Sequence, residues 1–521
     1  MPPPAPRRTS AAGALPRFPL RSSDVQLYRL SEALTELLLY GMVVFSPWAF
    51  GTTEPWSVWT MNAAGYLLGV LWVIKLAIRR FKGYRPPRWD DASVPADNEA
   101  PPREKAASWL TTALAALTGA ILVYCLIAAL NARSTYYPHQ IRFEYHDYVP
   151  WLPHSFDRAR TWLAFFTLLG LAGSFWAVRD WLLGKTGGEE RAARRPPLPV
   201  GTALDSAPFL PARLRRLLWV LAINGGLLGL EGIAQRLEGS GHLLFLVKPR
   251  VNPGAETQFG PYAYRANAAQ YFNLLWPVCL GFWWTLHRSG GFRRARHHLL
   301  LLCGIIMAAC PIISTSRGGA LITGGLVVAA AFFLLFTHFL LVAARQQTPR
   351  TRWLTLAAVV VFFGAALAVG YWLGWKPLKP RLDQISEGFV LREEMYDVAR
   401  PMMRDYPWFG VGPGAFEYLF QLYRISPRTY WPAQLHNDWL ETRITYGLVG
   451  TALILSALAL VLLRWFFRGG IHGGRRFVIL MWLALAGCLV HARFDFPFQV
   501  HSIQFLFLLL CAILVNLSRR P

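Results

Sequence analysis

The string HNDWLETRITYGLVG, which runs from His436 to Gly450, holds the side chains best suited to chemistry in this sequence. On a helix, His436 and Arg443 would share one face, because residues seven positions apart align. A histidine on that face can remove a proton while the arginine holds an anion. The alternative is a histidine that lies at a membrane interface where a helix starts, and the residues leave both interpretations open.

A second string, STSRGGAL, places Arg317 between two apolar runs, and Gly318 and Gly319 open the second run. A guanidinium group and the backbone N–H groups of a helix N-terminus together bind phosphate well. The alternative is an arginine that only marks membrane topology. A different glycine pair, Gly324–Gly325, predicts close helix packing rather than a phosphate site.

Three further strings carry polar candidates. Arg265 and Asn267, in FGPYAYRANAAQYFN, precede an apolar run, and Arg392 begins the amphipathic stretch LREEMYDVARPM, where its neighbouring glutamates could pair with it. Asp495, in HARFDFPF, lies close to the end of another apolar run. A carboxylate at membrane depth is costly, so we expect Asp495 to be functional and paired with an arginine such as Arg493.

The composition predicts that transmembrane helices position these residues. The chain has 521 residues, of which 54% are hydrophobic and only 16% charged, whereas about a quarter of a soluble protein is charged. Apolar runs long enough to span a bilayer predict about twelve transmembrane helices in an all-α polytopic fold. The predicted spans are 33–51, 57–78, 109–131, 161–183, 217–235, 268–286, 298–314, 320–343, 354–375, 445–465, 477–493 and 499–517.

The net charge is +24, and the basic residues lie mainly in short loops between apolar runs, a pattern that sets membrane orientation. Anionic lipid headgroups are therefore the expected partner, rather than nucleic acid. The excess of Lys and Arg in the loops on one side predicts that both termini lie in the cytoplasm. Segments 132–160, 236–267, 315–319 and 376–444 then lie outside, together with the candidate histidine and arginines.

This orientation divides the chain into four parts. Residues 1–32 form a cytoplasmic tail, 33–375 carry the first nine transmembrane helices, 376–444 form a small helical periplasmic cap, and 445–521 carry the last three helices and a tail. In the cap we expect helices over 391–404, after the turn GVGPG through Tyr423, and from Ala433 onward. The six cysteines all fall in apolar runs, so we expect small buried side chains without disulfide or metal.

Three strings, in this order, resemble the O-antigen ligase and O-antigen polymerase family of bacterial envelope glycosyltransferases. STSRGG is similar to a helix start of the family, and DYPWFGVGPGAF is similar to the turn that precedes the family's histidine. His436-Asn437, nine further residues and Gly447-Leu-Val-Gly450 resemble the ligase signature. The resemblance covers about residues 255–500.

The resemblance implies a GT-C-like fold and transfer of a glycan from an undecaprenyl-pyrophosphate donor to an acceptor hydroxyl. The reaction would take place on the periplasmic side of the bacterial inner membrane, without a metal or other cofactor. His436 would be the base or would orient the acceptor, while Arg265 and Arg317 would hold the pyrophosphate. The remaining expected substrate-binding residues are Arg392, Asn437 and Arg443, with Asn267 and Asp495 in support.

The acceptor stays open among three possibilities. A ligase would use lipid A-core, a polymerase another lipid-linked repeat, and a protein O-oligosaccharyltransferase a Ser or Tyr hydroxyl. The signature at His436 favours the ligase type. An alternative of a different class is a small-anion transporter of the bicarbonate type, which the absence of an evident internal repeat and the one-sided cap disfavour.

Overall fold

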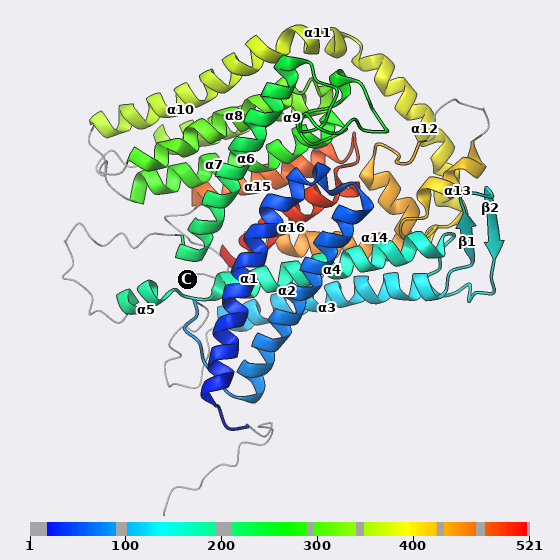
Figure 1. Ribbon diagram of the computed structural model, residues 1–521, viewed down its shortest axis with the longest axis horizontal. Helices are drawn as coiled ribbons and strands as arrows, with labels where there is room; N and C mark the ends of the chain where they lie inside the picture. The colour runs from blue at the N-terminus through cyan, green and yellow to red at the C-terminus, as the bar shows by residue number, and fades with distance from the viewer. Residues whose placement is uncertain are drawn as a thin grey trace, which may run out of the picture.

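The computed structural model describes residues 18–89, 102–193, 210–289, 295–339, 349–424, 432–464 and 475–517. This part of the chain is almost entirely helical (Figure 1). Eight of its helical segments are long and apolar enough to cross a membrane. The prediction of an all-α polytopic membrane protein is thus confirmed at that level.

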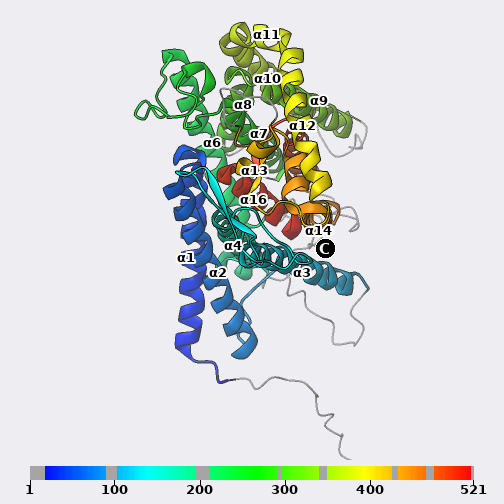
Figure 2. The ribbon, with the colours of Figure 1, turned by 90° about the vertical axis from the view of Figure 1, so that its right-hand side faces the viewer.

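The amino-terminal helices are α1 (Ser22–Trp48), α2 (Pro55–Phe81), α3 (Pro102–Leu130) and α4 (Arg158–Leu183), followed by the short α5 (Gly187–Ala193). Figure 2 shows α1 and α2 side by side at one edge of the molecule. Helices α2 and α4 cross closely at glycines, since a Cβ at Gly65 would lie 2.4 Å from the carbonyl oxygen of Gly170. Small residues let two backbones approach in this way.

The second group of helices packs around α7 (Arg265–Ser289), whose side chains Trp276 and Trp283 are completely buried. Its members are α6 (Ala212–Glu238), α8 (Leu299–Ile313), α9 (Arg317–Phe339), α10 (Pro349–Gly370), α15 (Arg475–His491) and α16 (His501–Leu517). Short 3-10 turns lie at Phe50–Thr52, Ala255–Thr257, Ala295–His298 and Pro497–Gln499. All six cysteines are buried, as predicted, and are free thiols.

Each of the twelve predicted spans overlaps a described helix, and eight meet the length and hydropathy expected of a membrane span. The eight are Pro55–Phe81, Trp109–Leu130, Arg158–Leu183, Ala212–Glu238, Arg296–Ile313, Arg317–Thr337, Leu356–Asp383 and Asp438–Leu463. A ninth, His501–Leu517, is apolar but shorter. The number twelve stays a prediction.

The predicted cap contains the helices that were expected there. Helix α10 continues through a π turn (Tyr371–Trp375) into α11 (Lys376–Asp383), and α12 (Ile385–Asp405) and α13 (Phe416–Tyr423) follow. Helix α14 (Asp438–Leu463) begins later than the predicted Ala433. The cap has its own apolar core, formed by Phe156, Tyr396, Ala399, Met402, Val411, Ala415, Phe416, Leu419, Phe420, Leu435 and Ile444.

The segment 132–160 contains an antiparallel hairpin that the sequence did not predict, with strands β1 (Ser134–Tyr137) and β2 (Arg142–Tyr145). The hairpin packs on the cap, because Tyr136 stacks on Tyr418 with ring centroids 4.1 Å apart. The strands, α12 and α13 lie together at one end of the molecule (Figure 1). Segments 132–160 and 376–444 therefore share one end of the molecule, and the assignment of this end to the periplasm stays a prediction.

Candidate active site

His436 lies directly before the N-cap residue of α14 and has a left-handed backbone with φ of 55°. Asn437 is the N-cap of the helix, and its side-chain oxygen accepts a hydrogen bond from the Leu440 N–H (3.2 Å). The prediction that His436 shares a helical face with Arg443 is therefore wrong. The physical reason is that asparagine is among the strongest N-caps, so the helix starts after it.

Neighbouring groups hold the backbone of His436 in place. The hydroxyl of Tyr396, on α12, donates to the His436 carbonyl (3.0 Å). The N–H of Leu435 donates to the carboxylate of Glu441 (2.8 Å), one turn into α14. Hydrogen bonds from the cap and from the membrane helix thus fix the backbone on both sides of His436.

The imidazole of His436 is oriented by Asp495. Its Nδ1 lies 3.1 Å from Oδ1 of Asp495, and its ring meets the Phe496 ring edge to face at 4.8 Å. Since an ionised carboxylate only accepts hydrogen bonds, Nδ1 is the donor, and in the neutral tautomer that this bond selects Nε2 is the acceptor. The side chain is 29% exposed, so a substrate can reach the imidazole ring.

Asp495 is buried at the centre of a polar group. Its Oδ2 accepts a hydrogen bond from the Tyr264 hydroxyl (3.2 Å) and lies 3.8 Å from Nη2 of Arg392 and 4.0 Å from Nε2 of His491. The predicted pairing of Asp495 with an arginine is present, but the partner is Arg392 from α12. Arg493 lies elsewhere, with its guanidinium 5.9 Å from the Tyr396 ring centroid.

The environment of Asp495 keeps its carboxyl ionised. Burial alone would raise its pKa, but the hydrogen bond from His436 and the charges of His436 and Arg392 outweigh burial and lower the pKa to about 2. Asp495 therefore holds a negative charge against His436 across the physiological pH range.

Asp438 fastens the turn that carries Asp495, although the sequence did not single it out. Its N–H donates to the Ala492 carbonyl (2.8 Å), and its carboxylate accepts the N–H of Phe498 (2.7 Å) and the amide of Gln499 (3.3 Å). Its only sequence signal was its place next to His436-Asn437. This carboxylate joins the start of α14 to the turn between α15 and α16.

A group of arginines lies beside this arrangement. Arg265 and Arg317 are the first residues of α7 and α9, Arg236 is in the last turn of α6, and Arg381 is on α11. The charge of Arg265 interacts with those of Arg381, Arg236 and Arg317, and Arg381 also interacts with Arg317. We call these four residues the arginine cluster. Arg236 and Arg381 were missed because each lies inside a helical stretch without a motif.

Backbone carbonyls, rather than carboxylates, hold most of the arginine cluster. Arg236 donates to the carbonyls of Ala255, Gln258 and Ser314, Arg317 donates to Gln384 (2.8 Å), and Arg265 donates to Glu256. The Nε of Arg381 is buried and has no hydrogen-bond partner within the described ranges. The cluster thus has surplus positive charge and an unused donor, both of which suit a polyanion.

Tyr264 connects the arginine cluster to His436. It directly precedes Arg265, donates its hydroxyl to Asp495, and stacks on Phe496 with ring centroids 5.3 Å apart. Burial and the charge of Asp495 raise the pKa of Tyr264 above its ordinary value, so the hydroxyl stays a donor. The sequence pointed only to an aromatic belt at this position.

The glycines after Arg317 serve helix packing. A Cβ at Gly319 would lie 2.3 Å from the Ala269 side chain of α7, and one at Gly318 would lie 3.1 Å from His491 of α15. The Gly319 N–H is already bonded to the Ser316 hydroxyl (3.1 Å). Arg317 itself reaches toward α12, where its guanidinium lies against Gly388.

The other predicted residues have local partners. Asn267 is buried in the first turn of α7, and its N–H bonds to the Tyr264 carbonyl (3.0 Å). Arg443 donates to the Pro407 carbonyl (3.0 Å) and so ties α14 to the cap. Arg392 and Asp495 lie together beside His436 and Tyr264. Arg265 directly follows Tyr264, and its charge interacts with that of Arg317. Arg443 is directed to Pro407 instead.

Helix α14 is interrupted at Gly447, whose φ of 61° and ψ of −166° fall in a region open essentially to glycine alone. The turn before α13 fills the interruption and satisfies the backbone groups that it frees. Four backbone hydrogen bonds do so, namely Val411 N–H to Ile444, Gly412 N–H to Thr445, Leu448 N–H to Pro407 and Val449 N–H to Trp408.

Fold and site together define a helical membrane protein with a histidine–aspartate pair and an arginine cluster at one end. Residues 302–455 match the family model described as O-antigen ligase. This match supports the family resemblance, and the matched residues include Arg317, Arg392 and His436. No curated protein matches the chain.

Proposed function

We propose that this protein is a membrane glycosyltransferase of the O-antigen ligase type. It transfers a glycan from an undecaprenyl-pyrophosphate donor to an acceptor hydroxyl on the periplasmic side of the inner membrane, with lipid A-core as acceptor. The observation that carries the proposal is the hydrogen bond between His436 and Asp495 (3.1 Å), beside the arginine cluster. A base and an anion site next to one another are what this transfer requires.

The chemical step divides between these two groups. Nε2 of His436 removes the proton of the acceptor hydroxyl as the oxygen forms a bond to the anomeric carbon of the glycan. The bond from that carbon to the pyrophosphate oxygen breaks, and its electron pair leaves with the pyrophosphate. Arg265 and Arg317, with Arg236 and Arg381, stabilise the charge that develops on the leaving group. Asp495 stabilises the imidazolium that forms.

The arginine cluster supplies the positive charge that a divalent cation provides in many other phosphate sites. We therefore expect transfer to continue in the presence of EDTA. Asn437 and Arg443 lie close in sequence to His436 and are proposed contacts to the pyrophosphate or the glycan, although each already has a structural hydrogen bond.

The test uses purified protein in lipid vesicles with lipid-linked glycan and lipid A-core. His436→Ala should lower transfer by about 10²–10⁴-fold, and Arg317→Ala by about 10²–10³-fold. His139→Ala and Arg142→Ala, exposed positions on the hairpin segment, are matched controls that should keep full transfer. Intact transfer in both site variants would refute the assignment.

Two further arms separate the alternatives. Lipid-linked repeats or a Ser- and Tyr-containing protein in place of lipid A-core distinguish a polymerase or a protein O-oligosaccharyltransferase. Absence of transfer to all three acceptors, together with bicarbonate flux into vesicles, would support the transporter instead.

Gly388→Ala displaces the Arg317 guanidinium, since the new Cβ would lie 2.7 Å from Nη2, and should weaken transfer without removing a charge.

A further inference from the structure

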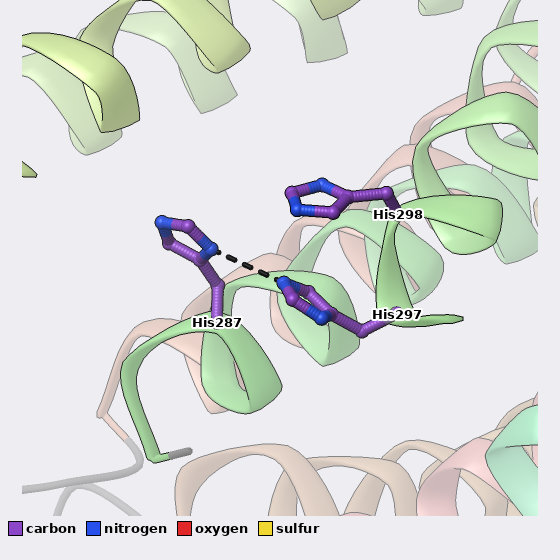
Figure 3. A group of neighbouring side chains, drawn as sticks. All are labelled: His287, His297 and His298. Atoms are coloured by element: carbon purple, nitrogen blue, oxygen red, sulfur yellow. Dashed lines mark hydrogen bonds between the residues drawn. The ribbon is translucent and has the colours of Figure 1, made fainter. Parts of the chain in front are cut away.

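A group of three histidines lies at the far end of α7 from Arg265. His287 is in the last turn of α7, while His297 and His298 end the 3-10 turn Ala295–His298 that leads into α8 (Figure 3). At 1.5 Å per residue, His287 lies about 33 Å along the helix from Arg265. The group is therefore separate from the candidate active site, and the proposed glycan transfer does not use it.

The three imidazoles face one another at short range. Nδ1 of His287 lies 3.2 Å from Nε2 of His297, and one ligating nitrogen from each of the three side chains lies within 4.8 Å of the others. The ring centroids of His297 and His298 are 4.1 Å apart. Within the described ranges, this is the group of His, Cys, Asp and Glu side chains that is close enough to hold a metal ion.

Trp283 supports the group from one turn below. Its ring is completely buried and stacks on His287 with centroids 5.0 Å apart and planes 17° apart, and it also contacts His298 at 6.5 Å. A buried, immobile ring that positions an imidazole reduces the rotamer freedom lost on binding. His287 is thus held ready by the fold.

We propose that His287, His297 and His298 bind a divalent transition-metal ion of the zinc class. Imidazole nitrogens bind Zn²⁺ at about 2.0–2.1 Å in a tetrahedral arrangement, which sets two ligand nitrogens about 3.3 Å apart. The observed 3.2 Å between His287 and His297 already meets that spacing. His298 completes the set by a side-chain rotation, and water takes the fourth position.

Binding replaces the hydrogen bond between His287 and His297 with two metal–nitrogen bonds, and the hydrogen of that bond moves to the other nitrogen of the donor ring. The ion joins the last turn of α7 to the start of α8. It therefore fastens the carboxyl end of α7, the helix that carries Arg265 at its amino end. The surrounding sequence is basic, with Arg288, Arg293, Arg294 and Arg296. The ion is therefore held by coordination and not by long-range attraction, and a hard cation such as Mg²⁺ gains little from imidazole ligands.

The experiment measures zinc bound by the full-length protein in detergent, purified with an affinity tag that contains no histidine. After equilibrium dialysis against ZnCl₂, elemental analysis should find about one more equivalent of zinc in the wild type than in His287→Ala/His297→Ala. A control with exposed histidines removed elsewhere, His139→Ala/His242→Ala, should retain that equivalent. Equal zinc content in the wild type and the site variant would overturn the proposal.

A second measurement guards against misfolding of the double variant. Zn²⁺ should raise the thermal midpoint of the wild type, and this shift should be lost in the single variant His287→Gln, because a ligand stabilises only the state that binds it. An identical shift in wild type and His287→Gln would also contradict the site. Neither readout depends on glycan transfer, so the result stands apart from the proposed function.

Discussion

At the residue scale, His436 combines a strained backbone with an oriented imidazole. A non-glycine residue in a left-handed conformation costs about 1–3 kcal/mol and persists only where its surroundings enforce it. Tyr396 and Glu441 enforce it here through the hydrogen bonds on either side of the histidine. With the backbone held in this way, the imidazole meets Asp495, and Nδ1 lies 3.1 Å from Oδ1.

Asp495→Asn tests the charge at the centre of the site. The carboxyl has an ordinary pKa of 3.8 and a folded-state pKa of about 2, so its ionisation stabilises the folded protein by about 2 kcal/mol at pH 7. A lowered pKa means that this stabilisation is present above pH 4 and is lost as the pH falls toward 2. Thermal unfolding in detergent should therefore show a lower midpoint for the variant at pH 7 and a shrinking difference below pH 4.

The same variant should lower glycan transfer at pH 7 by at least about 10²-fold, because the imidazole loses the group that selects its tautomer. A difference in midpoint that stays constant from pH 7 to pH 2.5 would show that the carboxylate charge does not stabilise the site.

At the element scale, α14 and the cap turn are mutually dependent. The helix breaks at Gly447, and the backbone of residues 407–412 supplies the missing hydrogen bonds. Tyr124 of α3 seals the junction, with its hydroxyl near the carbonyls of Phe409 (2.7 Å) and Tyr446 (2.9 Å). The spacing from His436 to Gly447 thus sets where the cap attaches to the membrane helix.

Gly447→Ala should prevent this attachment. Its Cβ would lie 2.3 Å from the Trp408 carbonyl oxygen, and its φ of 61° is strained for alanine. We expect a destabilisation above about 2 kcal/mol, measured as loss of monodisperse protein in detergent and as a lower thermal midpoint.

Gly325→Ala is the matched control, since no atom of the described residues lies within 4 Å of a Cβ built there or at Gly324. The prediction of close packing at that pair is therefore wrong, and the close approaches occur at Gly318 and Gly319 instead. Equal stability of the Gly447 and Gly325 variants would contradict the proposed role of the break.

At the scale of the whole molecule, elements far apart in sequence converge at one end. The hairpin meets the cap where Tyr136 stacks on Tyr418 (4.1 Å), and α4 meets it where Arg160 pairs with Glu417 (3.3 Å). The start of α9 meets the cap where Arg317 donates to the Gln384 carbonyl (2.8 Å). The proposed orientation assigns this end to the periplasm and the termini to the cytoplasm.

Thiol labelling tests the orientation directly, because all six native cysteines are buried and give little background. Glu387→Cys on α12 and Ser22→Cys on α1 are both exposed positions. A membrane-impermeant maleimide should label the first in intact spheroplasts and the second only after lysis. The reverse pattern would place His436 in the cytoplasm and contradict transfer on the periplasmic side.

The sequence by itself determined the class of fold and most of the candidate residues. Hydropathy and charge bias are sums over neighbouring residues, so they locate apolar helices without knowledge of packing. The glycine-rich turn and the string at His436 also carry their own backbone requirements. For these reasons the helices, the cap and the family resemblance could be predicted before the structure was known.

Only the tertiary structure decided which of these residues meet. Tyr264 and Asp495 are 231 positions apart and His436 and Asp495 are 59 apart, and no periodicity reports contacts at such separations. Tertiary packing also brought Arg236 and Arg381 to the arginine cluster and directed Arg443 to the cap. The physical reason is that helix spans are set by local apolar content, whereas the site is set by how separate helix ends pack against one another.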